Sequence, residues 1–194
     1  MATTINYEAP TWNQIYEMLV DQAEKIRKSS YQPDIIVGVA RGGLVPARIL
    51  TDLLGVPEVA TIQIEFYVDI AHTSPQPTLK QGLTKSVVAK KALLVDDISD
   101  TGQSLKLAKR YLLEQGAKEA KIATLYAKTS TITTPDYLEK QTENWIVFPW
   151  ETRETLRKIL QKNRGKRAAN QEIAKLIKAG LPKRLAERIL KTLK

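Results

Sequence analysis

Three acidic side chains within five positions are the residues of this chain best placed to do chemistry. Asp96, Asp97 and Asp100 follow the apolar run 92–95. Such a run is typical of a buried strand in a parallel sheet, and open sheets of this kind bind their ligands beyond the carboxyl ends of the strands. The pattern therefore predicts that these carboxylates lie at the edge of a ligand site, where they can accept hydrogen bonds from hydroxyl groups.

The segment 100–104 adds an anion site to these acids. It reads Asp-Thr-Gly-Gln-Ser, and an apolar pattern with helical spacing begins at Leu105. Backbone N–H groups at the start of a helix favour an anion, while the threonine and the serine add hydroxyls and the glycine permits a tight turn. A ribose 5-phosphate would satisfy both halves of the stretch, with its hydroxyls on Asp96 and Asp97 and its phosphate on the helix start.

A second candidate anion site precedes the acids in the chain. The apolar run 35–40 predicts a strand, Arg41-Gly42-Gly43 predicts a tight turn, and the apolar spacing from Leu44 predicts a helix. A helix start beside a fixed positive charge suits a phosphate or a pyrophosphate. A simple turn with a surface arginine has the same sequence pattern, so this segment taken alone leaves both interpretations open.

Residues 92–104 resemble the phosphoribosyl-pyrophosphate (PRPP) motif of the type I phosphoribosyltransferases. That motif consists of apolar residues, two acids, two variable residues, Asp-Thr-Gly and a hydroxyl residue, and it is complete here. The magnesium-binding strand of P-loop NTPases has a similar pattern, but the chain contains no G-x-x-x-x-G-K-[ST]. The acid pocket of a receiver domain would draw on the first strand, which here ends in Arg-Gly-Gly. A purely structural turn is the other alternative.

The resemblance implies a fold, a reaction and a set of partners. The fold is α/β, with a mainly parallel sheet and helices on both faces, and residues 1–152 would form the phosphoribosyltransferase domain. The reaction transfers 5-phosphoribosyl from PRPP to a base and releases pyrophosphate, with Mg²⁺ as cofactor. The family also implies a homodimer or a tetramer.

The resemblance assigns a role to each residue of the two loops. Asp100 would act as general base on the purine N7 proton, and Arg41 would hold pyrophosphate. Asp97 would contact Mg²⁺, and Asp96 would bind the ribose hydroxyls. The implied PRPP-binding residues are Asp96, Asp97, Asp100, Thr101, Gly102, Gln103 and Ser104, and the pyrophosphate loop is Ala40, Arg41, Gly42 and Gly43. Some family members have a cis peptide before the basic residue, which here would be Ala40–Arg41.

Three further segments resemble the base pocket of the 6-oxopurine branch, closest to xanthine-guanine phosphoribosyltransferases and their archaeal relatives. They are 126–128, 136–137 and 145–151, of which the last is predicted to be a short aromatic strand. Lys128 would then bind the purine 6-oxygen, and Trp145 would stack on the purine ring. The Ile146 backbone would contact the remaining edge of the purine. The expected base is hypoxanthine, guanine or xanthine. The alternatives are a core role for the tryptophan with a solvated lysine, and an enzyme for adenine or another base.

Residues 66–86 predict a long loop or an irregular hairpin, because they contain Pro75, Pro77 and Gly82. By resemblance this segment is the lid over the reaction centre, although Phe66-Tyr67 stand where the family commonly has Ser-Tyr. The only histidine, His72, lies within it and is interpreted as a solvent-exposed bystander.

Length and composition indicate one domain with an appendage, since 194 residues can bury one substantial core. No apolar run approaches the ~20 residues of a membrane span. The start lacks the features of a signal peptide, and the chain has no cysteine. These observations lead us to expect a cytoplasmic protein without a membrane partner.

The net charge of +9 is concentrated near the C-terminus. Residues 153–194 contain fourteen Lys/Arg and three Asp/Glu, whereas the first 152 residues contain sixteen and eighteen. Apolar spacing predicts three short amphipathic helices in this basic extension. It could bind nucleic acid, which would make the chain a PRPP-sensing regulator, or it could be a packing extension with a solvated charged face. The lack of aromatic residues within it favours the second interpretation.

Overall fold

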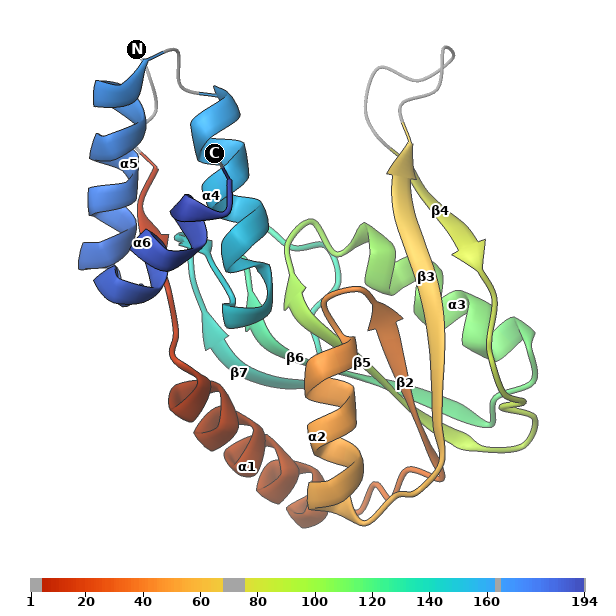
Figure 1. Ribbon diagram of the computed structural model, residues 1–194. Helices are drawn as coiled ribbons and strands as arrows, with labels where there is room; N and C mark the ends of the chain where they lie inside the picture. Colours follow the sequence, from red (N-terminus) through yellow and green to blue (C-terminus); the bar gives the residue numbers. More distant parts are fainter. Residues whose placement is uncertain (1–4, 68–75, 163–164, 194) are drawn as a thin grey trace. The chain divides into compact units, whose positions relative to one another are not determined.

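The computed structural model describes residues 5–67, 76–162 and 165–193 (Figure 1). The chain divides into two compact units. One unit is Tyr16–Thr142, and the other is formed from both ends of the sequence, Met1–Ile15 and Glu143–Lys194. Each unit has a hydrophobic core of its own. The division falls at positions 15 and 142, whereas the predicted functional domain extends to residue 152, and its extent stays a prediction.

The unit Tyr16–Thr142 contains a six-stranded sheet with the order β4-β3-β2-β5-β6-β7. Every neighbouring pair is parallel except β3 and β4, which are antiparallel. The strands are β2 (Ile35–Ala40), β3 (Val59–Tyr67), β4 (Gln76–Gln81), β5 (Lys91–Ser99), β6 (Glu119–Ala127) and β7 (Tyr137–Gln141). This mainly parallel sheet confirms the predicted fold class.

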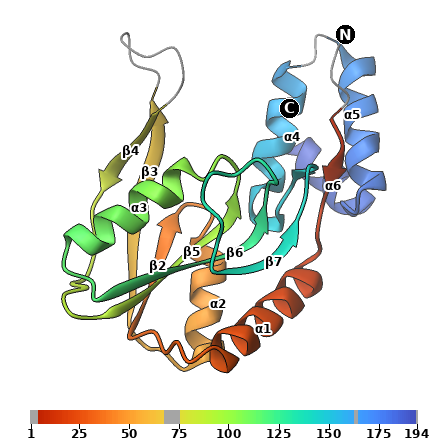
Figure 2. The ribbon, with the colours of Figure 1, turned by 180° about the vertical axis from the view of Figure 1, so that it is seen from behind.

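Helices cover both faces of this sheet. Helix α2 (Leu44–Leu54) and the Tyr16–Lys28 part of α1 (Trp12–Lys28) lie on one face, and α3 (Gln103–Glu114) lies on the other (Figures 1 and 2). The apolar residues of β2 and β5 are buried in unbroken runs, as a strand covered on both faces requires. The carboxyl ends of these two strands therefore provide a rigid edge for loops.

Three elements differ from the sequence-based predictions. Strand β5 does not end before its acids, because Ile98 and Ser99 still pair with β6. Strand β7 was not predicted, since its sequence Tyr-Leu-Glu-Lys-Gln is mostly polar. The predicted strand 145–151 is wrong beyond its first two residues: only β8 (Trp145–Ile146) is a strand, and a 3₁₀ turn, η1 (Pro149–Glu151), follows. Pro149 favours this turn because its ring fixes φ and it has no N–H for a sheet.

The second unit is a small helical cluster with a two-stranded sheet. Strand β1 (Tyr7–Glu8) pairs with β8 in parallel. The cluster consists of α4 (Thr152–Lys162), α5 (Lys166–Lys178) and α6 (Lys183–Lys191), which confirms the three predicted helices. Leu156, Leu176 and Ala186 supply one fully buried side chain from each helix. Within the described ranges, no helix combines the length and the apolar character that a membrane crossing demands.

Candidate active site

The first anion loop lies between β2 and α2. It consists of Arg41-Gly42-Gly43, and the peptide bond between Ala40 and Arg41 is cis, as the resemblance implied. The Gly43 N–H donates to the Val39 carbonyl at 2.9 Å, which closes the turn tightly before α2 begins at Leu44. The Arg41 side chain is exposed, so a charged group is presented at the end of a buried strand.

Both glycines of this loop are required by its close approach to β5. A Cβ on Gly43 would lie 2.9 Å from the Asp96 Cα and equally near the backbone N of Val39. A Cβ on Gly42 would overlap the Asp97 carboxylate. Without side chains, the loop backbone contacts the strand that carries the acids. The structure thus brings Arg41-Gly42-Gly43 and the two carboxylates together, as neighbouring parallel strands predict.

The two carboxylates differ in their environments. Asp97 is buried and faces Gly42. Burial raises the pKa of Asp96 well above its ordinary value, and the neighbouring Asp97 charge raises this pKa further. The Asp97 N–H donates to the Asp96 carboxyl at 2.9 Å, and this bond and the Gly43 backbone lower the pKa of Asp96 in opposition to these effects. The site therefore concentrates negative charge that a bound cation would neutralise.

The second anion loop connects β5 to α3. Gly102 has φ +79°, a left-handed conformation that favours glycine, and it directly precedes the helix. The N-cap residue, Gly102, has no side chain to cap the helix, but the Thr101 hydroxyl accepts a hydrogen bond from the Gln103 N–H at 3.3 Å. The N–H groups of the first helical turn have no intrahelical partner. Asp100 and Thr101 are exposed, whereas Gln103 and Ser104 are half-buried. An open helix start with hydroxyls beside it suits a phosphate.

The loop that connects β6 to β7 braces the second anion loop, residues 100–104, which we call the phosphate loop. The sequence did not reveal this contact. The Thr133 hydroxyl donates to the Gly102 carbonyl at 2.8 Å, and the Ile132 N–H donates to the Thr101 carbonyl at 3.0 Å. The Ser99 hydroxyl lies 2.7 Å from the Thr131 hydroxyl and donates to the Thr133 carbonyl at 3.0 Å. We call residues 131–133 the threonine brace.

Lys128 begins the loop that contains the threonine brace. Its N–H donates to the Ser99 carbonyl at 2.9 Å, so the lysine stands at the end of β6, next to the end of β5. The structure thus collects Arg41, the acids, the phosphate loop and Lys128 at one edge of one sheet. Asp136, from the second base-pocket segment, instead accepts a hydrogen bond from the Ile122 N–H at 2.8 Å.

The other two predicted base-binding residues belong to the second unit. Trp145 is 55 % exposed and Ile146 is buried, both in β8. The N–H groups of Trp145 and Val147 donate to the carbonyls of Asn6 and Glu8, so the Ile146 backbone faces away from β1. Trp150 is half-buried and stacks on Phe148 with ring centroids 4.8 Å apart. Base recognition by Trp145 and Ile146 stays a prediction.

The predicted lid corresponds to the arms of β3 and β4. These strands pair from Gln63 with Gln81 to Tyr67 with Gln76, which gives the expected hairpin. Residues 68–75, which include His72, lie outside the described residues. The role as a lid stays a prediction.

Comparisons with known proteins identify the family. The phosphoribosyl transferase domain model matches residues 11–155. Xanthine-guanine phosphoribosyltransferase from Nitratidesulfovibrio vulgaris is 32 % identical over 145 residues, which covers 73 % of this chain and 83 % of that protein. Hypoxanthine-guanine phosphoribosyltransferase from Schizosaccharomyces pombe is 27 % identical, with coverage of 74 % and 88 %.

A solved structure is similar in both fold and sequence. The crystal structure of purine phosphoribosyltransferase from Pyrococcus horikoshii Ot3 has a TM-score of 0.68 and 39 % sequence identity, and the match covers 75 % of this chain and 94 % of that chain. These matches confirm the resemblance on which the sequence-based predictions rest. This chain belongs to the phosphoribosyltransferase family.

Proposed function

We propose that this chain is a purine salvage enzyme that transfers 5-phosphoribosyl from PRPP to hypoxanthine, guanine or xanthine. The observation that carries this proposal is the convergence of two open anion loops and a carboxylate pair at the ends of β2 and β5. A ligand with pyrophosphate, ribose hydroxyls and a 5-phosphate presents those three groups. The named relatives act on the same class of base.

In this proposal the chemistry takes place at the anomeric carbon. The bond to pyrophosphate breaks with its electron pair on the leaving oxygen, and purine N9 bonds to the same carbon. Asp100 receives the N7 proton that the base loses, which its exposed position at the start of the phosphate loop permits. Asp96 and Asp97 stabilise the positive charge that develops on the ribose, and Arg41 holds the departing pyrophosphate.

The acids also fit the Mg²⁺ that PRPP-dependent enzymes use. Mg²⁺ is commonly held by one or two carboxylates together with substrate phosphates, rather than by a cage of protein ligands. Within the described part of the chain, no group of three or more potential metal-binding side chains occurs. Asp97 is the residue that would hold the ion, because its carboxylate faces the pyrophosphate loop. When bound, Mg²⁺ would neutralise charge on the leaving pyrophosphate.

Three residues are proposed to bind the base. Lys128 would donate to the purine 6-oxygen, since it stands at the same sheet edge as Asp100. Trp145 has the exposed indole that stacking on a purine requires, and the Ile146 backbone faces away from β1. The base-binding role of these residues is supported by their exposure and backbone direction.

A homodimer or tetramer and a cytoplasmic location complete the proposal. Helix α2 carries apolar side chains that are exposed or partly exposed in the single chain, among them Leu44, which is 40 % exposed. Such a surface supports contact with a second copy, which sedimentation would reveal. The cytoplasm is proposed because PRPP and the nucleotide product are multiply charged and do not cross membranes unaided.

The test is pyrophosphate release from PRPP and Mg²⁺ with hypoxanthine, guanine, xanthine and adenine in turn. We expect turnover with the oxopurines and little with adenine. Asp100→Asn should lower kcat by about 10²-fold or more, the usual scale for a general base, and leave PRPP binding nearly unchanged. Tight PRPP binding without turnover of any base would overturn the proposal, and equal losses of binding and turnover in Asp100→Asn would overturn the role of that residue.

A further inference from the structure

The second unit carries nearly all of the net charge of the protein. Residues 1–15 and 143–194 contain fourteen Lys/Arg and six Asp/Glu, which accounts for +8 of the net charge of +9. The larger unit, Tyr16–Thr142, is nearly neutral with sixteen basic and fifteen acidic residues. A surplus of this size on about a third of the chain attracts polyanions.

The acids of the helical cluster each have a lysine within 4.0 Å. Glu154 pairs with Lys158 at 2.7 Å and Glu172 with Lys175 at 2.6 Å. The third acid of α4–α6 lies 4.0 Å from Lys183. Arg153 and Arg157 on α4 are exposed and form no ion pair with any residue that the structure describes. Their guanidinium groups are therefore available to an external anion.

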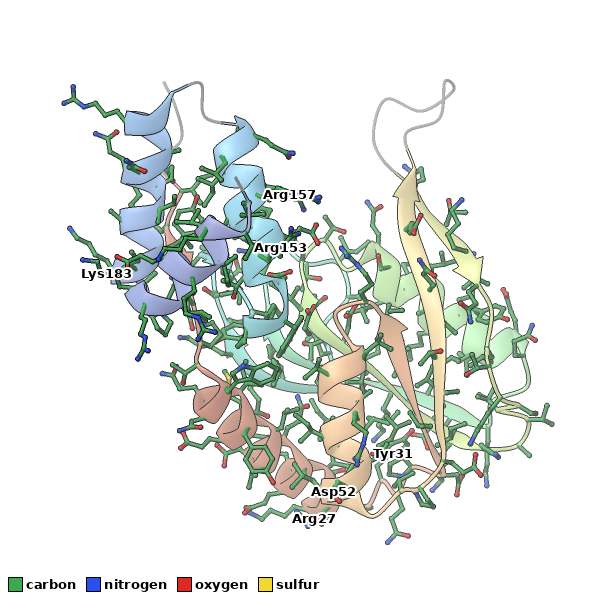
Figure 3. All side chains as sticks on the ribbon, viewed as in Figure 1. Arg27, Tyr31, Asp52, Arg153, Arg157 and Lys183 are labelled. Carbon is green, nitrogen blue, oxygen red and sulfur yellow. The ribbon has the colours of Figure 1, made fainter. Side chains whose placement is uncertain are left out.

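These two arginines form a row with an aromatic pair. Trp150, Arg153 and Arg157 follow each other at spacings of three and four residues through η1 and α4, which places them along one side of the helix. Figure 3 shows both arginine side chains projecting from the same side of α4. Trp12 lies against Trp150 with ring centroids 5.6 Å apart and an interplanar angle of 52°, and its indole is 54 % exposed.

The structure thereby removes the sequence-based objection to nucleic acid binding. That objection was the lack of aromatic residues within 153–194, but the fold adds Trp12 and Trp150 to the same unit as the basic helices. An exposed indole can stack on a base, and guanidinium groups form bidentate hydrogen bonds with phosphates. Successive arginines four residues apart on a helix stand about 6 Å apart along its axis, a spacing that lets both contact one extended strand.

We propose that the row Trp12, Trp150, Arg153 and Arg157 is a binding site for single-stranded nucleic acid. Trp12 stacks on a base, and the two arginines bind the neighbouring phosphates. A single strand is favoured over a duplex because only unpaired bases offer their faces to an indole. This function is additional to the proposed phosphoribosyl transfer and does not depend on it.

The test measures fluorescence anisotropy of a labelled single-stranded RNA of about twelve nucleotides, a length within the usual site sizes, with the full chain at several salt concentrations. For Arg153→Gln/Arg157→Gln, the loss of two phosphate contacts should weaken binding about 25-fold near 0.1 M salt and lower the salt slope by about 1.4. The matched control Arg27→Gln/Lys118→Gln removes two exposed charges from the larger unit, of which Arg27 is labelled in Figure 3. It should change affinity less than about twofold, since it touches no contact of the site.

A second variant tests stacking independently of charge. Trp12→Leu should weaken binding about fivefold or more, the lower end for one stacked base, and Trp12→Phe should restore part of it. Single-stranded DNA of the same sequence distinguishes a polynucleotide site from one that reads the RNA 2′-hydroxyl. Inorganic polyphosphate, which has no bases, should bind equally to the Trp12→Leu variant and to the unmodified chain.

Three results would overturn the proposal. One is equal RNA affinity for the arginine variant and its matched control. Another is RNA duplex bound as tightly as the single strand, with no effect of Trp12→Leu. The third is a raised KM for PRPP in the arginine variant, which would assign these guanidinium groups to the substrate phosphates instead.

Discussion

Replacing Thr133 with valine tests whether the threonine brace positions the phosphate loop. Valine has the shape of threonine but lacks the hydroxyl that donates to the Gly102 carbonyl at 2.8 Å. That carbonyl still accepts the Lys106 N–H at 3.0 Å, so the substitution leaves no buried acceptor without a partner. The change therefore removes one tether of the loop and little else.

The size of the effect follows from the energy of one hydrogen bond. A net contribution of about 0.5–1.5 kcal/mol corresponds to about a 2- to 13-fold shift in an equilibrium. If the tether holds the loop in its phosphate-binding conformation, PRPP binding must supply that energy in the variant, and the KM for PRPP should rise by this factor. The kcat at saturating PRPP should stay within about twofold, because the reacting groups are unchanged.

The assay combines initial rates at varied PRPP with direct titration of PRPP binding. Thr134→Val is the matched control, since Thr134 is an exposed residue of the same loop without a hydrogen bond to any described residue. Thermal unfolding of both variants reports stability, and a loss of about 1 kcal/mol would lower the Tm by roughly 2–4 °C for a chain of this size.

Two results would refute the reasoning. In the first, Thr133→Val lowers the Tm but leaves PRPP binding unchanged, which would make the brace a purely structural contact. In the second, Thr134→Val weakens PRPP binding as much as Thr133→Val does, which would show that the loop responds to any loss of polarity.

Three further changes test other contacts. Gly42→Ala should lower kcat/KM by about tenfold or more, because the added Cβ overlaps the Asp97 carboxylate and overpacking of this kind costs about 1–3 kcal/mol; steady-state kinetics with circular dichroism would separate this from unfolding. Removing Mg²⁺ with a chelator should weaken PRPP binding to the unmodified chain more than to Asp97→Asn, as measured by titration calorimetry, and equal losses would exclude Asp97 as the ligand. Tyr7→Phe should destabilise the protein by about 1 kcal/mol at pH 7, because Tyr7 donates to Glu172 at 3.0 Å. Lys175, and then Tyr7, hold the pKa of Glu172 below its ordinary value, so this stabilisation is present above the unfolded pKa and is lost as the pH falls through the folded one. Urea unfolding should therefore show a smaller penalty at pH 3 than at pH 7.

Local signals made much of the sheet edge predictable. Apolar runs specified β2 and β5, and helical spacing with glycine turns specified the starts of α2 and α3. Each signal spans a few neighbouring residues, so it can be recognised without knowledge of the fold. Adjacent parallel strands then bring both anion loops to one edge, whatever the details of the loops.

The contacts that could not be predicted are those between distant segments. The threonine brace lies in a polar run without periodicity, and its partners are some thirty positions earlier in the chain. The pairing of β1 with β8 joins two strands of only two residues each, Tyr7–Glu8 and Trp145–Ile146, which are too short a pattern to recognise. The same pairing explains why the unit with the basic helices also contains Trp12, and so why the sequence understated its aromatic content.

The two glycines of the first loop also account for the electrostatics of the site. A Cβ on Gly43 would lie 2.9 Å from the Asp96 Cα, and the Asp97 carboxylate faces Gly42, so an anion loop and an acid pair lie in contact. A side chain at either glycine would separate them. Because burial and the neighbouring charge already raise the pKa of Asp96, a pyrophosphate brought to this loop adds repulsion unless a cation comes with it. In the proposed function, the preference for a metal-bound substrate would thus arise from how closely the two glycines let the loop approach the acids.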